Sequence, residues 1–351
     1  MLPTKSLALI LHFALTGAAA FIFKADSTNL SGLSDNLPTT YDLAATQMNV
    51  SDTPAAGGSF WSSSFVRASN GHDYMVVSHV LAGAVGPGSI YRASGTDITD
   101  PSYYYTFSKL SDSSDVYSAT KVFNASFGDW GMGSTSSTDP ISRMRTFSTV
   151  KNVQFDITFE TSSPVLLNGG LGVFQCGSSL GHEWSMPAGK TTGSLTIGGK
   201  KLSIVSDKSL TWYDRQWGTA PNSWTWFELH LDNGVKMSVW NWDKSDSYAA
   251  AAFATVRQPH GVQAVVPAAS LQKSKKTWTS SVSGFSYPVS YILTLEDGTK
   301  LNIANIRGDA ELVAPNGAQT TYEGFITVNG IYKGSKNVQG FGLVEVEPTT
   351  S

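Results

Sequence analysis

The sequence contains a single cysteine, Cys176, in 351 residues, so no disulfide can form within the chain. Charged residues make up only 15% of it, compared with roughly 25% in average globular proteins. The net charge is −3 and no basic run is present, which argues against a nucleic-acid-binding protein. Cys176 lies in the apolar run GLGVFQC, and we expect a buried, unreactive thiol.

The common cofactor and metal motifs are also absent. The chain has neither a phosphate-binding loop nor a G-x-G-x-x-G pattern. His182-Glu183 begins like a zinc-binding helix motif, but Met186 stands where the second histidine belongs. We therefore expect an activity that needs no cofactor and no metal.

The segment Gly177–Gly181 matches G-x-S-x-G, the pattern around the nucleophile of serine hydrolases. That nucleophile must lie on a turn that leads from a strand into a helix. The residues that follow, HEWSMPAGKTTG, contain Pro187 and two glycines, which do not form such a helix. We expect a turn at this segment rather than a hydrolase site.

Long apolar runs are absent except near the start of the chain. Met1–Lys5 supplies one positive charge, the apolar segment SLALILHFALTG follows, and Ala18-Ala19-Ala20 ends it. This order is typical of a secretory signal peptide that is cleaved near Ala20. The alternative is a membrane anchor, for which the apolar run is short.

Three N-glycosylation sequons begin at Asn29, Asn49 and Asn124. Each of them is weak evidence alone, because such triplets arise often by chance. Together with the signal peptide they predict a secreted, extracellular glycoprotein.

Turn and strand signals are abundant, and helical periodicity is nearly absent. Three segments have strand patterns on both sides of a short glycine turn, which predicts β-hairpins. They turn at Asn70-Gly71, at Asp232-Asn233-Gly234 and at Asp297-Gly298. The best helix candidate is YAAAAFATV, from Tyr248, and the segment Gly128–Pro140 is expected to be a loop. These patterns predict an all-β protein of antiparallel barrels or sandwiches.

The length of the chain exceeds what one ordinary core accommodates, so two domains are expected. A boundary is predicted near Thr219-Ala220-Pro221-Asn222. The predicted organisation is a signal peptide over residues 1–20, one β domain over residues 21–218 and a second over residues 219–351.

Two short segments combine aromatic and ionisable residues. In GHEWSMP, the alternation of a strand places His182 and Trp184 on one face and Glu183 on the other. In TWYDRQWG it groups Trp212 with Asp214. If the first group of each segment faces one cavity, that cavity holds two indoles, an imidazole and a carboxyl.

An aspartate among indoles loses hydration, which raises its pKa and allows it to donate a proton near neutral pH. The alternative is a structural Asp214 that caps a turn, with the tryptophans as core. Alternation groups Arg215 with Tyr213 and Trp217 on the opposite face, so Arg215 need not lower the pKa of Asp214.

These residues resemble the family of lipocalin-like hydratases that includes bacterial carotenoid 1,2-hydratase. The resemblance covers nearly the whole mature chain. Its marks are, in chain order, FWSSSFV before Asn70-Gly71, His182-x-Trp184, Trp-Tyr-Asp-x-x-Trp-Gly at residues 212–218, TWFELHLDNG at residues 225–234, and a Glu-Gly…Gly…Gly-x-Gly…Glu pattern within residues 321–347. One position departs from the pattern: the family often has histidine directly after the acid, where this chain has Arg215.

The resemblance implies two tandem lipocalin-like β-barrels with the substrate between or inside them. It implies a hydro-lyase that adds water to the prenyl double bond of an antimicrobial isoflavonoid of plants, which detoxifies it as a tertiary alcohol. Asp214 would protonate the alkene, and His182 would relay the proton or position the water. Trp184 and Trp212 would bind the substrate and offer their π faces to the carbocation.

Two other functions remain open at this point. Similar tandem barrels in fungi are Diels–Alder cyclases, which fold a polyene and need no strong acid, although the secretion signal counts against such an enzyme. A non-catalytic small-molecule binder would have an apolar cavity and a structural Asp214. Only a hydratase would add labelled water oxygen to a prenylated phenol.

We predict cleavage near Ala20 and export with glycans on some of Asn29, Asn49 and Asn124. The intact mass of protein from the culture medium, before and after enzymatic deglycosylation, measures both events. An unglycosylated intracellular product that still begins at Met1 would contradict this prediction.

Overall fold

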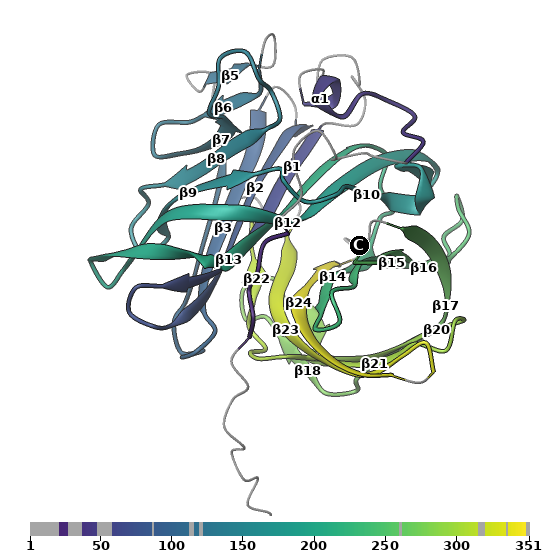
Figure 1. Cartoon of the computed structure of the whole chain (residues 1–351). Coiled ribbons are helices and arrows are strands. Elements are labelled where there is room, and N and C mark those ends of the chain that lie inside the picture. The colour runs from purple at the N-terminus through teal and green to yellow at the C-terminus, as the bar shows by residue number, and fades with distance from the viewer. Residues whose placement is uncertain are drawn as a thin grey trace, which may run out of the picture.

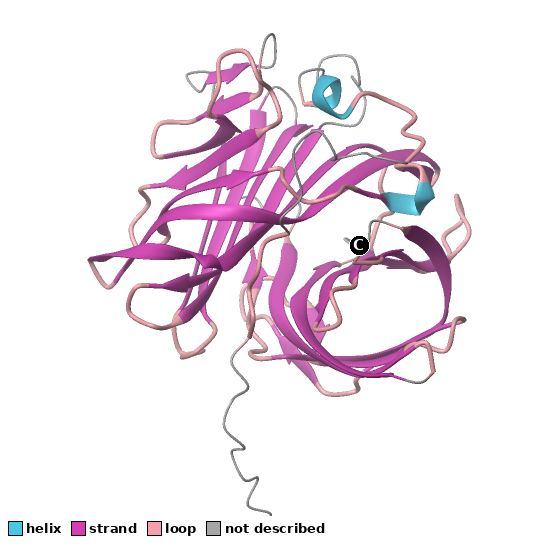
Figure 2. Cartoon of the chain, in the orientation of Figure 1, coloured by secondary structure: helices cyan, strands magenta, loops and turns pink. Residues whose placement is uncertain are grey.

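The computed structural model describes residues 21–26, 37–47, 58–85, 88–111, 116–118, 122–259, 262–314, 320–334 and 336–348. Nearly all regular structure in these residues is β-strand (Figure 2), which confirms the expected all-β class. The helical elements are α1 (Leu43–Thr46) and the short 3₁₀ helix η2 (Asn168–Gly170). In this part of the chain, no helix has the length and apolar character that crossing a membrane requires.

The first sheet is antiparallel and curled like half a barrel (Figure 1). Its strands are β1 (Gly58–Ala68), β2 (Asp73–Val85), β3 (Gly88–Asp97), β4 (Tyr104–Leu110), β5 (Val116–Ser118), β6 (Asn124–Ser126), β7 (Trp130–Ser134), β8 (Arg143–Ser148), β9 (Gln154–Glu160), β10 (Leu166–Leu167), β11 (Val173–Cys176), β12 (Ser179–Ile197) and β13 (Lys200–Gly218). Their order is β4-β3-β2-β1-β13-β12-β9-β8-β7-β6-β5, and β10 and β11 both pair with β12. Bulges in the β12–β13 pairing bend these long strands and help to curl the sheet.

The second sheet closes into an eight-stranded barrel, seen in Figure 1 as the ring of green and yellow strands. Its strands are β14 (Trp224–Leu231), β15 (Lys236–Trp242), β16 (Ala251–Arg257), β17 (Gln263–Lys273), β20 (Ser290–Leu295), β21 (Lys300–Asn305), β23 (Thr321–Tyr332) and β24 (Lys336–Glu347). Pairing between β21 and β23 closes the ring. The short strand β22 (Glu311–Leu312) pairs with β23, and β18 (Thr277–Thr279) pairs with β19 (Ser286–Pro288).

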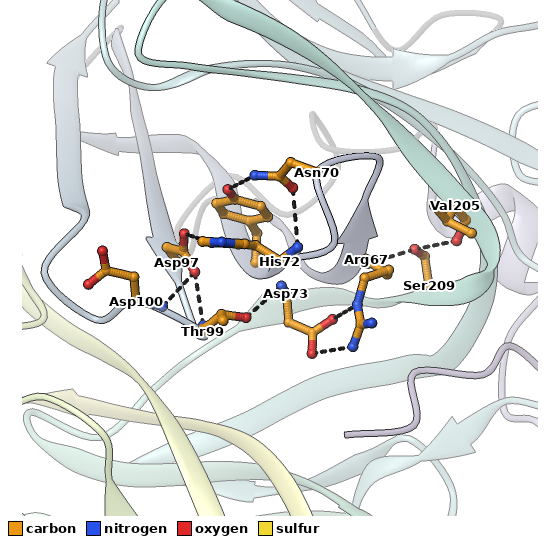
Figure 3. Close-up of polar contacts among 10 residues, drawn as sticks. Arg67, Asn70, His72, Asp73, Asp97, Thr99, Asp100, Val205 and Ser209 are labelled. Atoms are coloured by element: carbon orange, nitrogen blue, oxygen red, sulfur yellow. Dashed lines mark hydrogen bonds and ion pairs between the residues drawn. The ribbon is translucent and has the colours of Figure 1, made fainter. Parts of the chain in front are cut away.

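The predicted hairpin at Asn70-Gly71 joins β1 to β2. Gly71 has a φ of +86°, a left-handed conformation that glycine adopts without strain. The Asn70 amide donates to the Tyr74 hydroxyl at 2.8 Å and accepts from the His72 backbone N–H at 3.2 Å. The His72 ring contacts Asp97 at 2.7 Å, so polar side chains fix this end of the sheet (Figure 3).

The other two predicted hairpins form as expected, between β14 and β15 and between β20 and β21. The segment Gly177–Gly181 contains the predicted turn, at Gly177-Ser178, and β12 follows it as a strand. Because no helix follows, the geometry of a serine-hydrolase nucleophile is excluded here.

Two local predictions are wrong. The alanine-rich helix candidate from Tyr248 forms strand β16 instead, because both of its edges pair, with β15 and β17. The expected loop Gly128–Pro140 contains strand β7, whose Trp130 stacks on Tyr91 in the core. Tertiary pairing and packing overrule local preference at both places.

Three buried cores organise the molecule. One fills the hollow of the curled sheet and another fills the barrel. The third, which we call the seam, lies between strands β1, β2 and β13 of the sheet and the outer surface of β14, β15, β23 and β24. The seam is rich in aromatic side chains, among them Phe23, Trp61, Phe65, Trp212, Trp226, Trp240, Phe325 and Phe341.

The seam explains why strand β14 has no solvent-exposed face. Alternation points Phe227 and Leu229 into the barrel core and Trp226 and Glu228 toward the seam, so all four are buried. The first sheet ends at Gly218 and the barrel begins at Trp224. The division into two domains stays a prediction, because the two sheets share the core of the seam.

We predict that Gly342→Ala destabilises the barrel. Gly342 pairs with Leu229 where β24 passes β14, and an added Cβ would lie 1.9 Å from the carbonyl oxygen of Glu228. Because the strands would have to move apart, the free energy of unfolding should fall by about 1–3 kcal/mol in urea denaturation. The control is Gly95→Ala, where no heavy atom lies within 4 Å of the added Cβ. Equal losses in the two variants would show that close strand approach is not the cause.

Candidate active site

A cavity of about 450 Å³ lies between the curled sheet and the barrel. Its aromatic wall consists of Trp61, Trp217, Trp224, Trp226 and Trp240. Its ionisable side chains are His79, Arg92, Glu183, Asp214, Glu345 and Glu347. Gly218, at the end of β13, and the link between the two sheets, residues 219–222, complete the wall. The size and the mixed lining suit a small molecule.

Strand pairing decides which residues share a face with Asp214. On β13, Asp214 lies directly opposite Trp61 of β1 and Ser185 of β12. Residues directly opposite on neighbouring strands point to the same face of a sheet. Glu183, two residues before Ser185, therefore shares that face and also lines the cavity.

The expectation that His182 and Trp184 share a face with Asp214 is wrong. Trp184 lies opposite Arg215, is fully buried in the core of the curled sheet, and donates its indole N–H to Thr46 Oγ1 at 2.9 Å. His182 stacks on Trp217 with 5.0 Å between ring centroids. Neither side chain lines the cavity, because the register of β12 against β13 points both to the opposite face.

Trp212 lies behind Asp214 rather than in the cavity wall. Its indole N–H donates to Asp214 Oδ1 at 2.7 Å, and its ring packs edge-on against Trp226. Trp212 therefore does not present its π face to the cavity, and its hydrogen bond orients the acid.

Indole donors to buried carboxyls recur throughout the site. Each pair fixes one carboxyl oxygen as an acceptor and leaves the other oxygen for further contacts. The pairs are Trp212 with Asp214 at 2.7 Å, Trp240 with Glu183 at 2.9 Å, Trp224 with Glu345 at 2.6 Å and Trp61 with Glu323 at 3.4 Å.

Burial raises the pKa of Asp214 to about 7, against hydrogen bonds from Ser185 and Trp212 that lower it. Burial and the nearby Asp214 charge raise the pKa of Glu183 well above its usual range. Two carboxyls that interact in this way do not readily ionise together. At neutral pH the pair therefore retains a proton in a water-poor site.

The barrel strands carry more acids, which the sequence interpretation did not single out. Glu345 and Glu347 line the cavity, and Glu323 accepts from Trp61 in the seam. Burial raises the pKa of Glu323 and of Glu347 to about 8, and it also raises the pKa of Glu345. Arg92, across the seam, opposes these shifts in all three groups. The sequence does contain a pattern that indicates two of these acids: in VEVE, residues 344–347, strand alternation places Glu345 and Glu347 on one face.

Arg215 points away from Asp214, as expected. Its guanidinium lies 4.2 Å from the ring centroid of Phe60 and 5.0 Å from that of Trp217, and its Nε donates to the carbonyl of Thr46 at 2.9 Å. The charge is thus held by aromatic faces and carbonyls in the core. Arg215 ties the end of α1 to β13.

Asn124 and Cys176 do not line the cavity. Asn124 is exposed on β6, whereas Asn29, Asn49 and the signal peptide at residues 1–20 lie outside the described residues. Cys176 is fully buried and its burial raises its pKa, in agreement with an unreactive thiol.

A family model described as AttH-like matches residues 90–348. The chain belongs to the AttH-like family. It is 36% identical to kievitone hydratase of Fusarium solani subsp. phaseoli over 316 residues, which cover 89% of this chain and 87% of that protein. It is 32% identical to dehydratase asqC of Emericella nidulans over 350 residues, which cover 97% and 98% of the two chains.

The solved structure of kievitone hydratase from Nectria haematococca superimposes with a TM-score of 0.86 at 35% identity and covers 94% of this chain and 99% of that one. The resemblance to the lipocalin-like hydratases is thus confirmed for the fold and the family. A hydratase and a dehydratase among the relatives indicate that this chain is a hydro-lyase.

The raised pKa values predict that the protein loses stability as the pH rises. In the unfolded chain these carboxyls have a pKa of about 4, whereas in the folded chain the pKa of Asp214 is about 7 and that of Glu323 is about 8. The folded state holds more protons between these values, so its free energy of unfolding falls as the pH rises through them.

We expect urea denaturation to give a lower free energy of unfolding at about pH 8.5 than at about pH 5, by on the order of several kcal/mol. Glu323→Gln should flatten this dependence, because glutamine has no proton to lose. A free energy of unfolding that rises over this interval would show that the acids are stabilised as carboxylates.

Proposed function

We propose that this protein is a secreted hydratase that adds water across the prenyl double bond of a kievitone-like isoflavonoid and thereby detoxifies it as a tertiary alcohol. The observation that carries the proposal is a carboxyl, Asp214, with a pKa raised to about 7, in a cavity lined by five tryptophans. The hydratase relative at 36% identity supports the direction of the reaction. The predicted signal peptide supports secretion.

In this mechanism the protonated Asp214 transfers its proton to the less substituted carbon of the double bond. The electron pair of the double bond forms the new C–H bond and leaves a tertiary carbocation. Water attacks that carbon, and the Asp214 carboxylate takes the proton that the water loses, so the acid is regenerated. The charge of the Asp214 carboxylate raises the pKa of Glu183 and so favours a proton on Glu183 while Asp214 is ionised.

The cavity wall suits a carbocation. Indole faces attract a cation by about 2 kcal/mol each when water is excluded, and Trp61, Trp226 and Trp240 are almost completely buried around the cavity. The carboxyls on both sides add negative potential as they ionise. Neither a purely pericyclic catalyst nor a passive binder needs such a store of protons beside the aromatic wall.

The direct test is incubation of a prenylated isoflavonoid with the purified protein in ¹⁸O-labelled water. We expect one labelled oxygen in a tertiary alcohol, measured by mass spectrometry. A cyclised product without label would favour the pericyclase, and tight binding without turnover would favour the binder.

We predict that Asp214→Asn abolishes turnover while the protein stays folded. Asparagine keeps the volume and the hydrogen bond from Trp212 but donates no acidic proton, so kcat should fall by about 10²–10⁴-fold or more. If Asp214 is only structural, the same change should cost about 1 kcal/mol of stability and little activity.

The matched control is Glu228→Gln. Glu228 is a buried seam acid that contacts Ser63 at 2.7 Å, and burial raises its pKa well above the usual range, but it does not line the cavity. Because Glu228 does not line the cavity, its loss should change kcat little. Turnover that survives in Asp214→Asn but not in Glu183→Gln would move the proton donor to Glu183.

A further inference from the structure

Three polar side chains from neighbouring strands are linked by hydrogen bonds into a series that ends in the cavity. Arg92 of β3 lies opposite His79 of β2, and Ser59 of β1 lies beside them. The Arg92 Nε–H donates to His79 Nδ1 at 3.0 Å, and His79 Nε2 lies 2.9 Å from Ser59 Oγ. All three residues line the cavity, and none of them has a role in the proposed proton transfers.

The proton positions in this hydrogen-bonded series follow from Arg92. A guanidinium stays protonated and offers only donors, so His79 Nδ1 must accept and cannot carry a proton. The ring proton therefore lies on Nε2 and is donated to Ser59 Oγ. His79 is buried, and both burial and the Arg92 charge lower its pKa well below its usual value, which agrees with a neutral ring.

This arrangement makes the series Arg92–His79–Ser59 a hydrogen-bond donor and not a base. With Nδ1 engaged by Arg92 and Nε2 already protonated, His79 cannot accept a proton through Ser59. The lone pair of Ser59 Oγ is engaged by His79, so its hydroxyl hydrogen is directed elsewhere. Within the described residues His79 is the only hydrogen-bond partner of that hydroxyl, and Ser59 is only partly buried at the cavity.

A donor backed by a fixed positive charge suits an electron-rich oxygen better than the attacking water. The water must lose a proton, and the acceptors for that proton are the carboxyls of the site. Ser59 lies two residues before Trp61, which pairs with Asp214. The position of Ser59 and the position of Asp214 are therefore about 7 Å apart along the strand direction. A hydrogen bond of about 2.8 Å and the few bonds from a ring oxygen to an adjacent prenyl double bond bridge that distance.

We propose that Ser59, held by His79 and Arg92, binds the phenol oxygen that neighbours the prenyl group on the substrate ring. This inference rests on the proposed function, because it names how the same site recognises its substrate. Ser59 thereby selects prenylated phenols.

The test compares a prenylated isoflavonoid with an analogue that lacks the ring oxygen next to the prenyl group, using wild type and Ser59→Ala. Binding is measured by quenching of tryptophan fluorescence, which needs no turnover, and KM and kcat are measured alongside. Ser59→Ala should raise Kd and KM for the phenol about tenfold and leave kcat within about twofold. For the analogue, the two proteins should bind equally.

The matched control is Ser62→Ala, since Ser62 is buried on the same strand but donates to the carbonyl of Ser78 at 3.4 Å, away from the cavity. It should bind both compounds like wild type. Equal weakening of both compounds by Ser59→Ala, or a fall in kcat with Kd unchanged, would overturn the proposal. Absence of labelled product in wild type would instead refute the hydratase, and the fluorescence comparison would still decide whether Ser59 binds the phenol oxygen.

Discussion

The burial of residues 209–215 of strand β13 on both faces is the constraint on which the rest of the structure depends. One face packs into the core of the curled sheet and the other into the seam, so each charged group in this stretch must find a partner or become neutral. Arg215, on the first face, keeps its charge among aromatic rings and carbonyls. Asp214, on the second, receives an indole N–H and has a pKa that permits a proton at neutral pH. The reactive group is a consequence of where the strand is buried.

The acids of the seam also lower the stability of the folded protein. Glu183, Glu323 and Glu345 each accept an indole N–H, yet burial still raises the pKa of all three. Groups in this condition weaken the folded state as they ionise. Such a concentration of perturbed acids in and beside one cavity is typical of sites that move protons. The closed barrel next to the seam, with its own apolar core, gives these acids a rigid wall.

Much of the fold could be predicted from the sequence, because the glycine turns at Asn70-Gly71 and Asp297-Gly298 fix their hairpins locally. The site could be predicted only in part. Alternation shows which residues of one strand share a face, so the separation of Asp214 from Arg215 followed directly. It does not show which face of β12 matches which face of β13, and this is why His182 was grouped with Asp214 in place of Glu183. Arg92 meets the barrel acids only through tertiary packing, which no local pattern encodes.

The link at residues 219–222 is part of the cavity wall although it belongs to neither sheet. The ladder of the first sheet ends before it and that of the barrel begins after it, so a change in its length would leave the strand register intact while it reshaped the space beside Asp214. In evolutionary terms, this link is a place where substrate preference can change at little cost to folding. Relatives that add or remove water on different skeletons are expected to diverge there first, while the acids on the two facing sheets stay in place.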